Sequence, residues 1–105
     1  MAGTALTVGV VGCACVLAVG LVVAGAGAVF SQRLAGAADA AALAAADAAS
    51  GAVSGFPCAR ADELAAASGA TLTACDLDGL IATVTVTSRF AAIDATASAR
   101  AGPPP

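Results

Sequence analysis

Residues 6–30 read LTVGVVGCACVLAVGLVVAGAGAVF, and this stretch decides the fold. It holds no charged side chain, and every charged residue of the chain lies between Arg33 and Arg100. As an α-helix the stretch would be about 37 Å long, whereas a bilayer core of about 30 Å needs roughly 20 apolar residues. A buried core helix is the alternative, but the rest of the chain is too short and too rich in Ala to surround one. We therefore predict a transmembrane segment within residues 1–32.

The composition argues against several functional classes. Hydrophobic residues make up 60% of the chain and charged residues 10%, against about 45–50% and about 25% in an average soluble domain. The chain has no Lys and only four Arg, so it has no basic patch for nucleic acid. It also has no His, which is the commonest general base and metal ligand. We expect no enzymatic activity, no cofactor, no metal site and no small-molecule substrate.

Small residues recur at four-residue spacing along the apolar stretch. Gly9 and Cys13 form one such pair, and Gly20, Ala24 and Ala28 form a longer row. Residues four apart lie on one side of a helix, and small residues there let two helices approach closely in lipid. We predict that these five residues form a helix-packing face.

The same stretch allows two processed forms. Ala24-Gly25-Ala26 and Ala26-Gly27-Ala28 resemble signal-peptidase sites. The residues before Cys13, Val10-Val11-Gly12, loosely resemble a lipoprotein cleavage box. Against both, no Lys or Arg precedes the apolar run, and the run is long for a signal. We expect an uncleaved anchor, with a secreted small disulfide protein or a lipoprotein as alternatives.

Residues 33–50 read RLAGAADAAALAAADAAS and continue the helix. Ala is the strongest helix former, and no Pro interrupts the run. Ser50-Gly51 is a typical helix end. We predict an Ala-rich helical stalk over residues 33–50, either continuous with the span or packed against copies of itself.

Residues 51–105 predict a small head. Pro57 in a first turn begins a short helix, and Gly69 ends it. Residues 71–77 and 80–88 are rich in Thr, Val, Leu and Ile, which favours two strands. The third expected strand covers residues 96–100, and residues 102–105 form a frayed tail. The fold class is α+β, with one short helix on a two- or three-stranded antiparallel sheet.

The turn between the first two strands sets their register. Asp78-Gly79 between two such runs predicts a hairpin, in which Leu77 faces Leu80. The expected pairs are Cys75 with Ala82, Thr73 with Val84, and Thr71 with Val86. The buried face of this hairpin would carry Cys75, Leu77, Leu80, Ala82, Val84 and Val86.

Two cysteines meet in this arrangement. Cys75 would point toward the short helix, which begins at Cys58. We predict a Cys58–Cys75 disulfide closing a loop of about 17 residues, worth roughly 3 kcal/mol in the chain-entropy model. The alternative is a pair of unrelated buried thiols.

Two signals set the orientation, and they disagree. Arg33 follows the apolar stretch and favours a cytoplasmic C-terminal side. A disulfide needs an oxidising compartment, and we give it more weight than one Arg. We therefore expect a single-pass cell-membrane protein with a cytoplasmic N-terminus and an extracytoplasmic head.

The order of these features resembles the actinobacterial TadE-like proteins associated with Tad-type (Flp) pilus assembly and secretion. The resemblance covers nearly the whole chain. It is carried by the uncharged span, Gln32-Arg33, the run AADAAALAAA at 37–46, Cys58, Gly69-Ala70, Cys75, Asp78-Gly79, Val84-Thr85-Val86 and Ala99-Arg100-Ala101-Gly102-Pro103. Tad pilins have a basic leader cleaved after Gly and a Glu five residues on, whereas nothing basic precedes Gly3 and Val8 stands at that distance from it. No processing residue is therefore carried over.

The resemblance implies a minor pilin or a pilus-assembly component. Such a protein would be structural and non-catalytic, and would act by helix packing with other pilin-like or Tad secretion-system proteins. It could enter a surface pilus. A single-pass subunit of an unrelated membrane complex is a further alternative.

Overall fold

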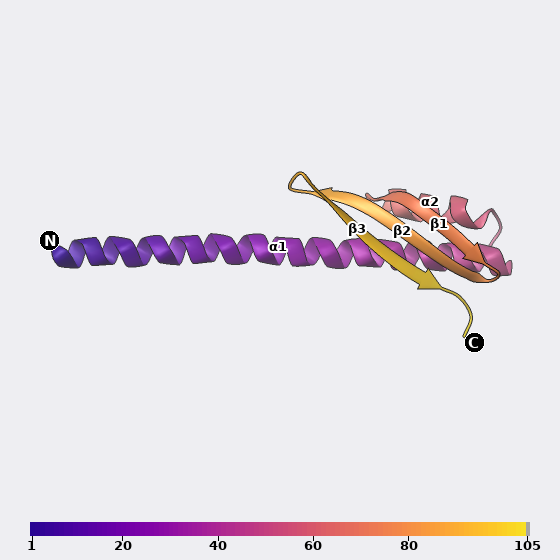
Figure 1. Ribbon diagram of the computed structural model, residues 1–105, viewed down its shortest axis with the longest axis horizontal. Helices are drawn as coiled ribbons and strands as arrows, with labels where there is room; N and C mark the ends of the chain where they lie inside the picture. Colours follow the sequence, from indigo (N-terminus) through magenta and orange to yellow (C-terminus); the bar gives the residue numbers. More distant parts are fainter. Residues whose placement is uncertain (105) are drawn as a thin grey trace.

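The computed structural model describes residues 1–104. Its elements are α1 (Ala2–Ser50), α2 (Pro57–Ala67), β1 (Thr71–Asp78), β2 (Ile81–Phe90) and β3 (Ile93–Ala101). The molecule measures 75 × 27 × 17 Å, because the first part of α1 projects alone while the other elements gather along its second part (Figure 1). The expected α+β fold, with a long apolar N-terminal helix, a short helix and an antiparallel sheet, is confirmed.

Both helices end where the sequence predicts. α1 is one unbroken helix of 49 residues, as its Ala content favours. It ends at Ser50, Gly51 caps it, and the Ala52 N–H donates to the Asp47 carbonyl at 2.9 Å. α2 ends just before Gly69, where the Ala70 N–H donates to the Ala65 carbonyl at 2.9 Å. Each bond satisfies a carbonyl that the helix leaves without a partner.

The Ala-rich part of α1 is not a free stalk. One side of it is buried against α2 and against β2 and β3. The buried residues are Leu34, Ala37, Ala38, Ala41, Ala42, Ala45 and Ala46. Because Ala is short, the sheet and α2 can approach the backbone of α1 closely. Residues 33–50 therefore form the helical layer of the head, rather than a separate segment below it.

The three strands form one antiparallel sheet in the order β1-β2-β3. α1 and α2 cover one face of this sheet (Figure 1). The covered face of β2 presents Ala82, Val84 and Val86, all fully buried. The other face carries hydroxyl side chains, and Thr85 and Ser98 form a cross-strand hydrogen bond of 2.9 Å. The head is a two-layer structure with a narrow, mostly aliphatic core.

The expected register of the first hairpin is wrong by two residues. Asp78 pairs with Ile81, so the two turn residues are Gly79 and Leu80, and Asp78 ends β1. Gly79 has φ 62, and Gly at the first position of a two-residue turn is typical of a type II′ turn. The expected turn placed Gly79 second. Because the shift is an even number of residues, Cys75 still lies on the covered face, now opposite Val84.

The inner face of β1 also differs from the expected one. Leu77 and Leu80 are 43% and 45% exposed, because they lie at the end of the hairpin where the helical layer stops. A bulge between Leu72 and Ala74 places Leu72 opposite Val86. Leu72 then packs against both core clusters. The bulge thus turns an apolar side chain inward where alternation predicts Thr73.

The third strand is longer than expected. β3 covers Ile93–Ala101 and pairs with β2 along its whole length. A two-residue turn joins them, and its residues Ala91 and Ala92 both have positive φ, 50 and 67. Of the expected tail, residues 102–104 lie outside the strands, and Pro105 lies outside the described residues.

Candidate functional site

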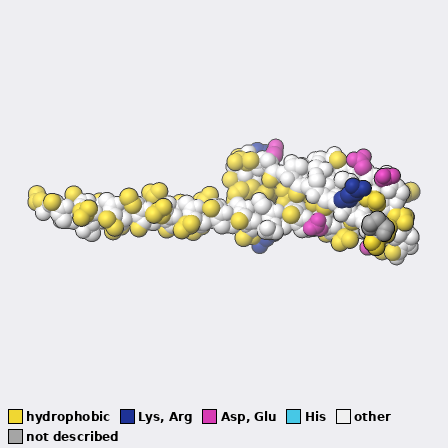
Figure 2. All heavy atoms as spheres, turned by 60° about the horizontal axis from the view of Figure 1, so that its bottom comes forward, with side chains coloured by type: hydrophobic (Ala, Val, Ile, Leu, Met, Phe, Trp, Pro, Cys, Tyr) yellow, Lys and Arg dark blue, Asp and Glu magenta, His cyan; other side chains and the backbone are white. Residues whose placement is uncertain are grey.

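The candidate site is the projecting part of α1, residues 2–29, which we call the arm. Its residues 2–26 are all exposed, and they include Val16, Leu21 and Val22, each more than 70% exposed. Its most apolar 18-residue window has a mean hydropathy of 2.6. Among the described residues, α1 is the one helix long and apolar enough to cross a membrane. Figure 2 shows the arm as a thin rod studded with hydrophobic side chains. Such a surface is unfavourable in water at about 25 cal/mol per Å².

Part of the predicted helix-packing face forms a shallow apolar groove. Gly9 and Cys13 line this groove together with the larger side chains of Leu6, Val10 and Leu17. The groove exists because the two small residues leave a gap between their bulkier neighbours. A helix with bulky residues opposite this gap could approach the α1 backbone closely.

The predicted face runs along the same side of α1 as the core of the head. At 3.6 residues per turn, Gly9 and Gly20 lie within about 60° of Ala41 and Ala45 around the helix axis. Cys13 lies on this side too, whereas Cys15 lies on the opposite side. Ala24 and Ala28 continue the row and are exposed. A helix packed on this face of the arm would therefore lie on the same side of α1 as the sheet and α2, nearer the N-terminus.

The predicted disulfide is present. Cys58 near the start of α2 is bonded to Cys75 on β1, with their Cα atoms 5.9 Å apart and a sequence separation of 17. The bond joins the short helix to an edge strand of the sheet. Cys13 and Cys15 are free thiols, both exposed on the arm.

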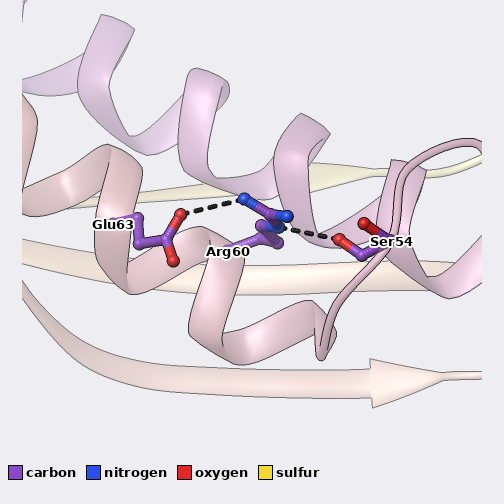
Figure 3. A network of polar contacts seen from close by, with 3 residues as sticks. All are labelled: Ser54, Arg60 and Glu63. Carbon is purple, nitrogen blue, oxygen red and sulfur yellow. Dashed lines mark hydrogen bonds and ion pairs between the residues drawn. The ribbon is translucent and has the colours of Figure 1, made fainter.

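Arg60 holds the loop between the two helices, which the sequence analysis missed. Its Nε donates to the Ser54 carbonyl at 2.8 Å, and its guanidinium pairs with Glu63 at 3.1 Å (Figure 3). Gly55 lies directly against the Arg60 side chain: a Cβ at position 55 would stand only 2.9 Å from Arg60 Nε. The i, i+3 spacing to Glu63 is visible in the sequence, but the contact with a backbone carbonyl is not.

A second unpredicted contact lies where the arm meets the head. The rings of Phe30 on α1 and Phe90 on β2 stack with centroids 4.9 Å apart and planes 28° apart. Phe90 also lies beside Gly27, where a Cβ would be 3.8 Å from its ring. The contact brings the turn between β2 and β3 to the top of the arm. The two rings are sixty positions apart in sequence, so no local pattern indicates it.

The polar and charged side chains of residues 1–104 are dispersed over the surface. No group of three or more Cys, Asp or Glu side chains in this range is placed to hold a metal ion. No polar or charged side chain in the described structure is buried. The described carboxylates therefore lie at the surface, where they act as solvated charges.

No family model, curated protein or solved structure matches this chain. The TadE-like resemblance read from the residues therefore stays a prediction. The function has to be argued from the arm, the head and the way they are joined.

Proposed function

We propose that this protein is a membrane-anchored, non-catalytic, pilin-like subunit of the TadE-like kind, acting as a minor pilin or an assembly component of a Tad-type pilus. The observation that carries the proposal is the exposed apolar arm, which continues as one helix into a disulfide-bonded head. Lipid would cover the arm before assembly, and other apolar helices would cover it afterwards.

The continuity of α1 gives this arrangement a mechanical consequence. The helix is unbroken from Ala2 to Ser50, and one side of its residues 34–46 is buried in the head. The head therefore has no hinge about which it could turn independently of the arm. When the arms of several subunits pack together, their packing would fix where each head lies.

The small-residue face supports packing against a helix. In lipid no hydrophobic force drives helices together, so close contact and van der Waals packing must do so. The groove at Gly9 and Cys13 offers such contact. Leu and Val around it favour insertion by about 0.3–0.6 kcal/mol each near the bilayer centre.

The disulfide supports a head outside the cytoplasm. Cytosolic proteins keep their thiols reduced, whereas secreted and surface proteins form disulfides. Cys58–Cys75 lies in the head, so the N-terminus would be cytoplasmic. Arg33 alone favours the reverse orientation, and one Arg has less weight than a covalent bond.

Cross-linking in native membranes tests the proposal, because Cys13 and Cys15 lie on opposite sides of the arm. The Cys15→Ser variant keeps only Cys13 on the arm, and the matched Cys13→Ser variant keeps only Cys15. Both are treated with a bifunctional thiol reagent, and the products are identified by mass spectrometry. We expect the Cys15→Ser variant, which keeps Cys13, to cross-link to chains with similar apolar N-terminal helices. The Cys13→Ser variant, which keeps Cys15, should do so much less. Cross-links to a transporter or a regulator instead would contradict the pilus assignment.

A processed, secreted form is a second candidate, and one observation favours keeping it. The first side chain that packs against the head is Phe30, and the motif Ala26-Gly27-Ala28 ends just before it. Cleavage after Ala28 would thus leave the core of the head complete. Mass spectrometry of the mature N-terminus decides: a start at residue 29 would overturn the anchor, and a retained arm would exclude this form.

A further inference from the structure

The turn between β2 and β3 is an apolar tip that points back along the arm (Figure 1). It consists of Phe90, Ala91, Ala92 and Ile93. Ala91 and Ala92 are exposed, and Ile93 is 69% exposed. No described element of the chain covers Ile93, although it is a large aliphatic side chain. The apolar tip therefore lacks a partner within this molecule.

The position of the apolar tip is fixed by its contact with α1. Phe90 stacks on Phe30, the last residue of the uncharged apolar stretch, and lies beside Gly27, one turn nearer the N-terminus. Three residues of helix correspond to about 4.5 Å. The first charged residue, Arg33, follows Phe30 at the same short distance. The apolar tip thus lies at the level where the apolar arm gives way to the first charge.

The charges around the apolar tip suit an anionic surface. Arg89 and Asp94 flank it as an exposed pair with Nε and Oδ1 3.4 Å apart. Arg33 lies one turn beyond Phe30 on α1 and lines a small hollow with Phe30 and the hydroxyl residues Ser68 and Ser88. Most acidic side chains in view gather over the far end of the head (Figure 2). Asp47 lies in the last turn of α1, and Asp76 and Asp78 lie at the end of β1. The end facing the arm therefore carries two Arg and one Asp, whereas the head as a whole is acidic.

We propose that the apolar tip is a lipid-contacting element that enters the headgroup region of an anionic bilayer. Ile93 and Phe90 would lie at the boundary of the acyl chains, where apolar side chains gain by leaving water. Arg33 and Arg89 would lie at the level of the phosphates, whose negative charge attracts basic residues next to a membrane. The inference rests on the proposed anchoring of the arm. It adds a second point of membrane contact, which would restrain the tilt of α1 and of the head relative to the bilayer.

Fluorescence quenching by brominated lipids tests this directly, because the chain has no Trp. A single Trp is placed at the apolar tip (Ile93→Trp), at the far hairpin (Leu80→Trp) or in the arm (Val16→Trp), all three at exposed positions. The full-length variants are reconstituted in vesicles of phosphatidylcholine and phosphatidylglycerol, with bromine on the acyl chains close to the headgroup or deep in the bilayer. We expect shallow bromine to quench the Trp at position 93, deep bromine to quench the Trp at position 16, and neither to quench the Trp at position 80.

The outcomes at the three Trp positions separate the proposed membrane anchor from the proposed lipid contact of the apolar tip. Quenching at position 16 without quenching at position 93 would refute the lipid contact and leave the anchor intact. No quenching at position 16 would refute the anchor and the inference that rests on it. A blue-shifted but unquenched emission at position 93 would show cover by protein, such as a second copy, and would also refute the lipid contact. Equal quenching at position 93 in phosphatidylcholine alone would refute the role of anionic headgroups.

Discussion

Gly55 is the residue on which the loop between the helices depends most. Its φ is 117, a backbone conformation that L side chains rarely adopt. A side chain there would also collide with Arg60, whose Nε lies 2.9 Å from the position of a Cβ. The loop therefore needs Gly at this position, both for the backbone and for the contact of Arg60 with Ser54.

We expect Gly55→Ala to lower the free energy of unfolding of the head by about 1–3 kcal/mol, the usual cost of a strained backbone position. The measurement is thermal unfolding of the full-length protein in detergent micelles, followed by circular dichroism. Gly36→Ala is the matched control, because Gly36 lies inside α1 with no atom within 4 Å of its Cβ position. That control should raise stability by about 0.5–1 kcal/mol, since Ala favours a helix. Equal effects of the two substitutions would contradict this account.

The sequence predicts the disulfide of the head, but it does not predict the contacts of Arg60 or the stacking of Phe30 on Phe90. Cys58 and Cys75 were paired correctly, because a cysteine has few possible partners and the strand pattern sets its direction. Arg60 was missed, because its main partner is a backbone carbonyl, which every residue carries. Phe30 and Phe90 were missed because only the path of β2 brings them together.

Among the elements, α1 is one continuous helix whose two parts lie in different environments. Its first part is exposed and apolar, whereas its second part is buried on one side. Ala at the buried positions sets a short distance between α1 and its neighbours, since Ala61 on α2 and Val84 on β2 belong to the same cluster as Ala45. The head therefore depends on the absence of larger side chains along this side.

Ala45→Leu is expected to destabilise the head by about 1–3 kcal/mol, because added methylene groups do not fit a well-packed core. Ala45 is fully buried. Ala35→Leu makes the same change at an exposed position of the same helix and should have little effect. Denaturant unfolding of both variants, with the secondary structure as the signal, measures the difference. A core that accepted Leu at position 45 as readily as at position 35 would show that the helices are not in close contact.

The elements themselves could be predicted, but their packing could only be predicted in part. Capping residues and Pro57 indicated where the helices begin and end, and alternation indicated the buried face of β2. The register was wrong because Asp78-Gly79 allows Gly at either turn position. The bulge at Leu72 leaves no local signal in the sequence. The burial of α1 was missed because Ala occupies nearly every side of residues 35–49, so no apolar stripe marks the covered one.

The whole molecule consists of an apolar arm and a head that share one helix. The division expected from the sequence placed the head at residues 51–105, after an Ala-rich stalk. The described contacts instead place the second part of α1 inside the head. The row of small residues along one side of the arm follows from sequence spacing alone, and its role as a packing face stays a prediction. Its alignment with the core of the head does not follow from the spacing, because that depends on which side of α1 the sheet covers.

This division predicts how the chain can be cut. A chain of residues 29–105 keeps Phe30 and the seven buried residues of α1, so we expect a water-soluble monomer that unfolds cooperatively. A chain of residues 51–105 lacks those residues and exposes Val84 and Val86 to water, so we expect no cooperative transition even with the disulfide formed. Size-exclusion chromatography and thermal circular dichroism of both chains give the comparison. Cooperative unfolding of residues 51–105 alone would show that α1 only rests on a head that is already complete without it.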